Sequence, residues 1–298
     1  MKDKAKKINK INSRSPRQLV WRRFLRNKLA LVGLGMLLIV VLIAIFAPFL
    51  ATHDPNHIYM DRFRQAPSEE HLLGTDSLGR DVWSRVVYGS RVSLTVGITA
   101  VSIYILIGVT IGSLAAYFGG ITDMVLMRFT DIIMSFPFLL FALVIVATLQ
   151  GEGNIWVVMG VIGFLGWTTN ARLIRGQILV LRNHDFVDAA RAIGASHKRI
   201  IFKHLLPNAM APVLVASTLS MAFAIMTEAA LSFLGMGVPP TMASWGSMMS
   251  EANSRMVMDR MPWLWVPPGV AILITVLSIN FVGDGLRDAL DPKQKNVE

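Results

Sequence analysis

Long stretches without Asp, Glu, Lys, Arg or His constrain the fold of this chain more than any other feature. Six of them hold 19 to 31 residues each: Leu29–Thr52, Val92–Thr122, Ile132–Gly151, Gly153–Ala171, Leu205–Thr227 and Met261–Gly283. A helix that crosses a bilayer needs ~20 mainly apolar residues. Only 16% of the 298 residues are charged, against about 25% in a soluble domain. The sequence therefore predicts an all-α membrane protein with six transmembrane helices.

A seventh stretch, Ala229–Ser250, also lacks charge but differs in composition. It contains three glycines and two prolines, among them the pair Pro239–Pro240. These residues would break a helix in hydrocarbon, where freed backbone groups find no water. We therefore expect an ordered loop here, and whether 229–250 re-enters the membrane stays open.

Positive charge is distributed unevenly between these stretches. Residues 1–28 hold 11 Lys and Arg, residues 172–204 hold seven and the tail holds three, whereas residues 53–91 and 228–260 hold five and two. Because loops rich in Lys and Arg stay in the cytoplasm, both termini and the 172–204 loop are predicted to be cytoplasmic. The first apolar stretch exceeds the roughly 7–15 residues of a cleaved signal peptide, so we expect it to remain as an anchor.

The predicted topology divides the chain into five segments. They are a basic cytoplasmic N-terminal segment (1–28), the first transmembrane helix (29–52), an external loop with an interfacial helix (53–91), a transmembrane domain (92–283) that includes a cytoplasmic loop (172–208), and a cytoplasmic tail (284–298). Within the external loop, the residues from Arg80 to Tyr88 are expected to form the interfacial helix. Asp81 and Arg85 lie at i and i+4 in it, the spacing of a helical ion pair.

Charge placement and missing motifs exclude several kinds of protein. The net charge of +10 lies mainly in the segments predicted to be cytoplasmic, which indicates topology rather than nucleic-acid binding. The chain has no cysteine and no Gly-Lys dipeptide, which excludes a thiolate metal centre and a P-loop. All six histidines lie outside the six stretches, so no catalytic or metal site is predicted. A nearly chargeless membrane centre disfavours ion-coupled transport, so a transporter of this kind would receive its energy from another subunit.

The cytoplasmic loop contains the most specific pattern. Asn183 or Asp185 can cap a first short helix, which Gly194 can end in the left-handed conformation. Ser196 can cap a second helix that ends at Pro207. Helices this short are unstable alone, so we expect another protein to pack on them. From periodicity alone, an amphipathic loop lying on the lipid surface is an equal alternative.

The spacing in this loop resembles a signature of the permease subunits of ATP-binding-cassette (ABC) importers, E-A-A-x-x-x-G-x9-I-x-L-P. Asp188-Ala189-Ala190 and Gly194 match its first half, with Asp188 in place of the usual Glu. His204 stands in place of the usual branched aliphatic residue. In that family the loop is the coupling helix, which docks into a cleft of the ATPase subunit. The resemblance implies ATPase coupling through Phe186, Asp188, Ala189, Ala190, Ile193, Gly194, Leu206 and Pro207.

A second string, in the external loop, resembles one branch of the same family. Residues 74–85 read GTDSLGRDVWSR and are similar to G-T-D-x-x-G-R-D-V-x-S-R. That element belongs to the peptide/nickel branch of type I ABC importers, in the subunit of the oligopeptide/dipeptide permease C type. From the residues alone, the string is an interfacial segment that leads into the second span.

The resemblance implies a permease subunit that forms half of the translocation pathway of a binding-protein-dependent importer in the bacterial plasma (inner) membrane. Its expected partners are a homologous second permease, two ATPases that bind ATP and magnesium, and an extracytoplasmic solute-binding protein. The chain itself is expected to be no enzyme and to bind no cofactor. Short peptides are the expected substrate, with nickel chelates or glutathione-like conjugates as alternatives. From other classes, an ion-coupled secondary carrier and a non-transporting scaffold stay open.

Further residues are singled out within or beside the spans. Glu228, near the predicted outer face, is the candidate substrate-path residue, as a partner for a peptide amine. Pro137 is expected to kink the third span. The small pair Gly108–Gly112 lets helices approach closely, within this subunit or against a second permease. Arg128 and Asp131, one turn apart, are expected to form a structural pair, or Arg128 to extend toward the membrane interface, rather than to contact the substrate.

Overall fold

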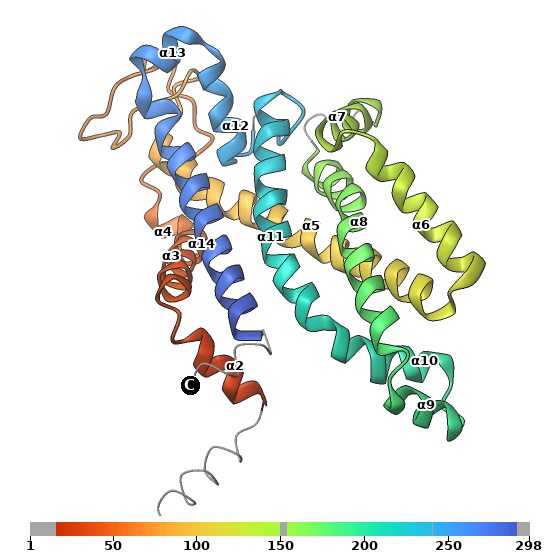
Figure 1. The fold of residues 1–298 in the computed structure, drawn as a ribbon. Helices are drawn as coiled ribbons and strands as arrows, with labels where there is room; N and C mark the ends of the chain where they lie inside the picture. The colour runs from red at the N-terminus through yellow and green to blue at the C-terminus, as the bar shows by residue number, and fades with distance from the viewer. Residues whose placement is uncertain (1–15, 150–153, 240, 291–298) are drawn as a thin grey trace, which may run out of the picture.

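The computed structural model of the chain describes residues 16–149, 154–239 and 241–290, and these residues form helices and loops without a strand. Figure 1 shows the long helices lying side by side. The ends of the predicted N-terminal segment and tail, 1–15 and 291–298, lie outside the described residues. In chain order the elements are α2 (Pro16–Phe24), α3 (Lys28–Ile45), α4 (Ala47–Leu50), α5 (Val82–Phe118), α6 (Gly120–Ser135), α7 (Phe138–Thr148), α8 (Ile155–Leu181), α9 (Asp185–Ala192), α10 (His197–Arg199), the π-helix η1 (Ile200–Leu205), α11 (Leu206–Phe233), α12 (Trp245–Met249), η2 (Ser250–Asn253), α13 (Arg255–Arg260), η3 (Pro262–Leu264) and α14 (Val266–Leu290).

Five helices are long and apolar enough to cross a membrane, and a sixth crossing is added if the bent pair α6–α7 counts as one span. The third predicted span overlaps this pair, which begins earlier, at Gly120 rather than Ile132, and bends by 89° at its break. Phe136 is extended there, with φ −90° and ψ 138°, because a following proline disfavours the helical conformation. The kink predicted at Pro137 is thus confirmed as a sharp break between two helices.

The second span begins earlier than its charge-free stretch suggests. Asp81 caps α5 by accepting a hydrogen bond of 2.8 Å from the Ser84 backbone nitrogen. From Val82 the helix runs unbroken for 37 residues, about 55 Å in length. Most of the helix predicted from Arg80 to Tyr88 is therefore present, but it begins at Val82 and continues without a break into the second span.

The helix after Ser196 also continues into the membrane. The predicted break at Pro207 is wrong, since α10, η1 and α11 form one run from His197 to Phe233. Within it the backbone widens to a π-helix, and the Leu206 nitrogen donates to the Ile201 carbonyl. Pro207 then lies in the first turn of α11, where its missing N–H has little cost.

Close packing of α5 against α8 forms the centre of the bundle. A Cβ added at Gly112 would lie 2.0 Å from Ile174 Cγ2, and one at Gly108 would lie 2.9 Å from Asn170 Cβ. Buried side chains of α5, α7, α8 and α11 build a hydrophobic cluster nearby. Of the two roles expected for the Gly108–Gly112 pair, packing within this subunit is the one observed.

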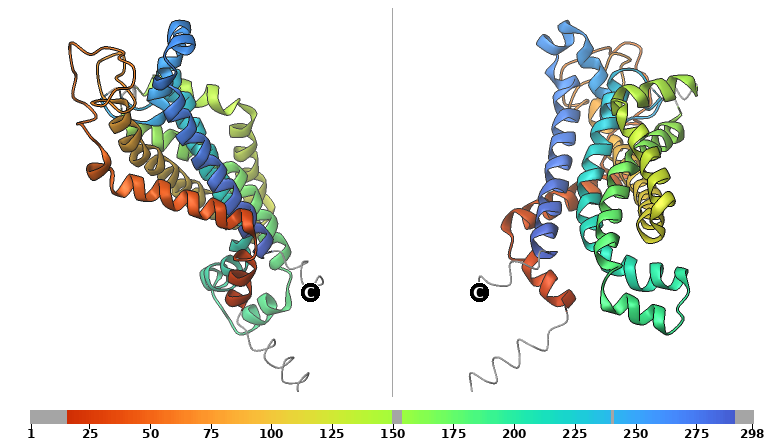
Figure 2. Two further views of the ribbon diagram at one scale, coloured as in Figure 1. Left: turned by 90° about the vertical axis from the view of Figure 1, so that its left-hand side faces the viewer. Right: turned by 45° about the vertical axis from the view of Figure 1, so that its right-hand side comes forward.

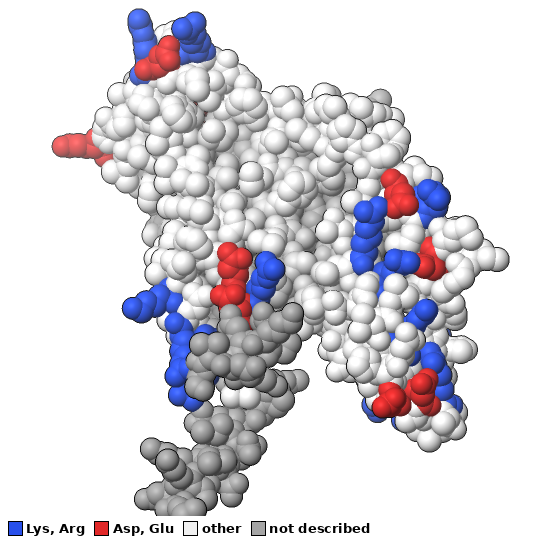
Figure 3. Space-filling view, viewed as in Figure 1, with Lys and Arg blue, Asp and Glu red and all other residues white. Residues whose placement is uncertain are grey.

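The molecule has two distinct ends, which Figures 1 and 2 place opposite each other. We call the part made of residues 51–81, α12 and α13 the loop end, and the part made of α9, α10 and η1 the elbow end. Between them, α3 packs along α14 and leaves side chains such as Leu38 and Ile39 exposed. In Figure 3, a broad band without charge lies below the charged tip of the loop end. The exposed apolar band fits a lipid environment.

Candidate functional site

The elbow end is a helix–turn–helix hairpin whose turn is set by glycine. Gly194 has φ +78°, a conformation that glycine adopts without a steric cost, and α9 ends just before it. Ser196 caps the second helix, as predicted, by accepting from the Arg199 backbone nitrogen. The cap expected at Asn183 or Asp185 is wrong, because His184 is the N-cap residue of α9 and its side chain makes no capping hydrogen bond.

The two faces of α9 differ in burial. Val187 and Ala190 are buried against Ile174 and Ile178 of α8, so Ala190 lies on the inner face. The opposite face carries the other predicted coupling residues of α9, all of them exposed. They are Phe186, Asp188, Ala189 and Ile193, with Ile193 84% exposed. Gly194 and Pro207 are exposed and Leu206 is half-buried.

Polar contacts tie the elbow end to the spans. The Tyr117 hydroxyl at the end of α5 lies 2.8 Å from His197 Nδ1. Arg182, after α8, donates to the Ala116 carbonyl at 2.6 Å. Because η1 is also continuous with α11, a force on the elbow acts directly on the ends of three long helices.

Two ion pairs join α6 to α8. Arg175 forms a bidentate pair with Asp123, at 2.5 and 2.6 Å, and Arg172 lies 2.6 Å from Asp131. The pair expected between Arg128 and Asp131 is therefore wrong, because Asp131 binds the neighbouring helix instead of its own.

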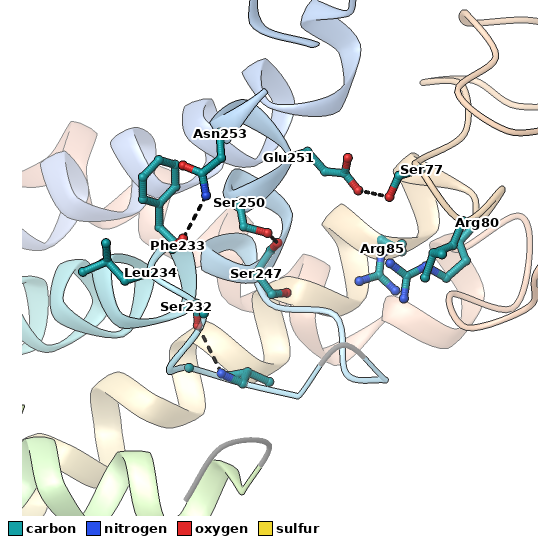
Figure 4. Close-up of a pocket in the computed structure, with 14 residues that line it drawn as sticks. Ser77, Arg80, Arg85, Ser232, Phe233, Leu234, Ser247, Ser250, Glu251 and Asn253 are labelled. Atoms are coloured by element: carbon teal, nitrogen blue, oxygen red, sulfur yellow. Dashed lines mark hydrogen bonds between the residues drawn. The ribbon is translucent and has the colours of Figure 1, made fainter. Parts of the chain in front are cut away.

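The loop end holds a cavity of about 860 Å³. Three segments line it: residues 77–85 of the loop and α5, residues 232–238 after α11, and residues 247–253 of α12 and η2. Figure 4 shows the guanidinium groups of Arg80 and Arg85 on one side and Phe233 with Leu234 on the other. Glu251 lies above the arginines and accepts a hydrogen bond from Ser77.

A buried carboxylate organises the two arginines. Asp76 is 4% exposed, and its Oδ2 accepts from Arg80 Nε at 2.8 Å and lies 3.4 Å from Arg85 Nε. The predicted Asp81–Arg85 pair is therefore wrong: Arg85 turns to Asp76. Asp81 instead accepts from His71 Nδ1 at 2.9 Å.

Glu228 lies behind this cavity, not in its lining. The side chain is 1% exposed, and its Oε1 accepts hydrogen bonds from Ser232 Oγ at 2.7 Å and Ser244 Oγ at 2.9 Å. Ser232 is a lining residue and also accepts from the Val238 backbone nitrogen. Glu228 thus fastens the end of α11 to the wall of the cavity.

One group of residues has the composition of a metal site. Nitrogen and oxygen atoms of His53, Glu70 and His71 lie within 4.8 Å of one another. Arg62 is inserted among them, paired with Glu70 and 3.3 Å from His71 Nε2, while Asp81 binds the other nitrogen of His71. The Arg62 guanidinium therefore occupies the position that a metal ion would need. Through these contacts the group fastens the loop to the start of α5. The hydrogen bond from Arg62 lowers the pKa of Glu70.

A second hollow, of about 530 Å³, lies between the long helices. Aromatic side chains from α5, α7 and α11, among them Tyr104, Phe138 and Phe223, line it beside the break at Pro137. Thr168 and Thr169 of α8 add hydroxyl groups. The hollow is thus mainly apolar, with a few groups that can form hydrogen bonds.

Comparisons with known proteins agree on the kind of molecule. Residues 108–296 match the family described as the binding-protein-dependent transport system inner membrane component, and residues 15–67 match the N-terminal TM domain of oligopeptide transport permease C. The glutathione transport system permease protein GsiD of Pectobacterium atrosepticum is 41% identical over 285 residues, 95% of this chain and 93% of that protein. A protein of Brucella abortus named as a peptide transport system permease is 44% identical over 282 residues, 95% and 94% of the two chains.

Structural similarity points the same way. A chain of the inward-facing MetNI methionine ABC transporter superposes on this chain with a TM-score of 0.51. The match covers 70% of this chain and 97% of that chain, at 19% sequence identity. At this identity the likeness concerns the fold alone, which is that of a type I ABC importer permease. The chain therefore belongs to the binding-protein-dependent permeases of ABC transporters, which are multi-pass proteins of the inner membrane.

Proposed function

We propose that this chain is one of two permease subunits of an ATP-driven importer of short peptides, and that it receives its energy at the elbow end. The observation that carries the proposal is the exposed apolar tip of that hairpin, where Phe186 and Ile193 lie 38% and 84% exposed. Phe186 lies on α9 and Ile193 directly follows it, and a helix this short is not stable alone. An exposed apolar tip of this kind suits a cleft on a partner protein.

The partner at the elbow end is an ATPase subunit that binds ATP and magnesium. In this arrangement Phe186, Ala189 and Ile193 form the docking face, and Asp188 contributes an acid at its edge. Ala190 holds the face in place from behind, because it is buried against α8. Leu206 and Pro207 begin α11, which carries the movement into the membrane.

The elbow end then lies in the cytoplasm together with both termini, and the loop end faces the solute-binding protein. A homologous second permease completes the pathway beside the aromatic hollow between the helices. Closure of the ATPases would move the elbow, and with it the ends of α5, α8 and α11. Glu228 contributes to the substrate path indirectly, by holding the cavity wall at Ser232.

Short peptides are the proposed substrates because relatives at 42–44% identity carry peptide-permease names. The relative named for glutathione, at 41% identity, supports a second candidate inside the same class, since glutathione is itself a tripeptide. Competition of unlabelled glutathione against a labelled tripeptide during uptake separates the two. Stronger competition by glutathione than by tripeptides would favour the second candidate.

The coupling assignment is tested with two substitutions in the complete transporter, reconstituted in liposomes with its binding protein. Ile193→Asp places a charge on the exposed tip, and Gly194→Pro cannot adopt the positive φ of the turn. Both should lower ATP-driven peptide uptake at least tenfold while membrane insertion is unchanged. Lys198→Ala, an exposed change on the second helix, serves as the control.

Three results would contradict the proposal. Unchanged uptake in both variants would remove the elbow from coupling. Uptake by the purified chain alone, driven by an ion gradient and insensitive to ATP, would indicate a secondary carrier. Peptide uptake that survives deletion of this chain from cells would indicate a scaffold.

A further inference from the structure

Two threonines that line the aromatic hollow between α5, α7, α8 and α11 differ from other threonines of the bundle. Six threonines in the remaining helices donate their hydroxyl group to the carbonyl four residues earlier, at 2.7–2.8 Å: Thr95, Thr110, Thr130, Thr148, Thr227 and Thr275. Such a bond satisfies the donor within its own helix. Thr168 and Thr169 of α8 form no such bond, and within the described residues their hydroxyl groups have no other partner. Both hydroxyl groups are therefore free to bind a group that enters the hollow.

Thr168 combines this free hydroxyl group with deep burial. It is 6% exposed and is the middle residue of α8, far from both ends of the span. Tyr104 of α5 also lines the hollow, and its buried hydroxyl group has no partner in the described part of the chain. A Cβ at Gly166 would lie 2.6 Å from that hydroxyl oxygen, so the tyrosine depends on a glycine there. At this depth an unsatisfied hydroxyl group is costly, because hydrocarbon offers it no acceptor.

The rest of the lining favours neutral, apolar groups. No charged residue is among the described residues that line the hollow, so nothing there selects a free amine or carboxylate. The rings of Phe136 and Phe141 stack with their centroids 4.8 Å apart, and those of Phe138 and Phe223 meet edge to face at 5.1 Å. Phe136 and Phe223 are 50% and 49% exposed, which leaves ring surface for a ligand. The volume of about 530 Å³ lies in the range of small-molecule sites.

The free hydroxyl groups indicate which occupant fits. A lipid acyl chain would cover the rings but has no hydrogen-bond acceptor at this depth. A helix of a second permease has its backbone carbonyls bonded within itself. An extended peptide, in contrast, brings unpaired backbone carbonyls together with side chains, so it satisfies both the hydroxyl groups and the rings.

We propose that the aromatic hollow binds a central residue of a transported peptide, whose backbone carbonyl accepts a hydrogen bond from Thr168 while its side chain lies against Phe223. The site therefore favours peptides with a large apolar side chain at that position. The proposal rests on the proposed peptide-import function and adds a contact site and a side-chain preference to it. The coupling residues at the elbow end take no part.

The test uses the complete transporter in lipid nanodiscs, with its second permease and ATPases but without the solute-binding protein. Equilibrium binding of radiolabelled trialanine and of alanyl-phenylalanyl-alanine is measured up to millimolar concentrations. The wild type should bind the peptide with phenylalanine about tenfold more tightly, because the larger side chain buries more apolar surface.

Substitutions of Thr168 test the contact with the peptide backbone. Thr168→Val removes the hydroxyl group and should weaken both peptides about fivefold, while Thr168→Ser keeps the hydroxyl group and should restore binding. Because the Thr168 hydroxyl has no partner in the described residues, the valine variant should unfold like the wild type. Thr227→Val is the matched control, since Thr227 is also 6% exposed but bonds within its own helix and does not line the hollow.

A substitution of Phe223 tests the contact with the side chain. Phe223→Ala should weaken alanyl-phenylalanyl-alanine about tenfold and leave trialanine nearly unchanged. Phe164→Ala, at a phenylalanine that is 53% exposed and does not line the hollow, should bind both peptides as the wild type does. A tripeptide with a central benzoylphenylalanine should form its photochemical crosslink within the lining of the hollow.

Each other outcome overturns the proposal. Equal binding of the two peptides by the wild type, or no binding of either, removes the side-chain site. Unchanged binding in Thr168→Val removes the backbone contact, and equal weakening of both peptides in Phe223→Ala indicates a structural role of the ring. Crosslinks that fall only on the second permease or at the loop end place the site elsewhere. Failure of the proposed function is a separate result, because it is seen as peptide uptake by cells that lack this chain.

Discussion

At the loop end, buried charged side chains fasten the chain before α5, whereas at the elbow end two short helices project with most of their side chains exposed. Asp76 and Asp81 at the loop end are 4% and 0% exposed, and each binds several residues, among them Arg80 at Asp76 and His71 at Asp81. On α9 the buried side chains are Val187 and Ala190. One end is thus held by polar contacts in the interior, the other by one apolar face.

The difference indicates how the two ends respond to change. A buried hydrogen-bonded acid is costly to remove, since its buried partners lose a charged hydrogen-bond acceptor. Exposed side chains on a projecting hairpin contribute little to folding, so they are available for binding a partner. We therefore expect stability to be concentrated at the loop end and coupling at the elbow end.

The largest effect on stability is expected for Asp81→Ala. This substitution removes the cap of α5 and the partner of His71, so it should lower the free energy of unfolding by about 3 kcal/mol. Unfolding in mixed micelles, followed by tryptophan fluorescence, measures the change. Asp54→Ala, an exposed acid of the same loop, should change it by less than about 0.5 kcal/mol. Similar values for both variants would remove the contrast between buried and exposed acids.

The elbow end offers a matched pair of apolar substitutions. Val187 is fully buried, so Val187→Ala should cost about 2 kcal/mol. Ile193→Ala, at an exposed site, should lower the free energy of unfolding by less than about 0.5 kcal/mol. It should nevertheless lower peptide uptake more than Val187→Ala does. The same unfolding and uptake measurements test both. If the exposed variant lost more stability than the buried one, α9 would be packed by the opposite face.

The spans and their breaks could largely be predicted from the sequence, because they depend on local properties. Charge-free length located the spans, Pro137 located the break, and Gly194 located the turn of the hairpin. The starts were missed where arginines belong to a helix. Arg91 lies inside α5 and donates to the Ala44 and Ile45 carbonyls, so the charge-free stretch begins at Val92, well after the helix begins at Val82.

The loop-end cavity could not be predicted, because it depends on contacts between distant residues. Glu251 meets Ser77 across 174 positions of the chain, and no local pattern indicates this. The motif in 74–85 did contain both arginines, but the i, i+4 spacing suggested Asp81 as the partner of Arg85 rather than Asp76. Likewise, the resemblance placed Phe186 and Ala190 together among the coupling residues, whereas in the structure Ala190 packs with Val187 against α8 and Phe186 is exposed.

An intermediate effect is expected at Glu228, whose burial resembles that of the acids at the loop end. Glu228→Gln keeps an oxygen that can accept from Ser232 and Ser244, so it should cost only about 1 kcal/mol. If Glu228 acts by positioning the wall, the variant should lower uptake of trialanine and of trialanine amide by the complete transporter in liposomes to the same extent. A change confined to one of the two peptides would instead indicate direct contact with the substrate.

The smallest effect is expected for Glu70, an exposed acid of the loop end that pairs with Arg62. The hydrogen bond from Arg62 lowers the pKa of Glu70 below its ordinary value of 4.5. A lowered pKa in the folded state means that the pair stabilises the fold above about pH 4.5, and that this contribution is lost as the pH falls through the lowered pKa. Carboxyl NMR of the wild type should give a titration midpoint below 4.5, and Arg62→Gln should return it to the ordinary range. Equal midpoints for Glu70 in the wild type and in Arg62→Gln would show that solvent screens this exposed pair completely. That result would sharpen the contrast with the buried acids Asp76 and Asp81.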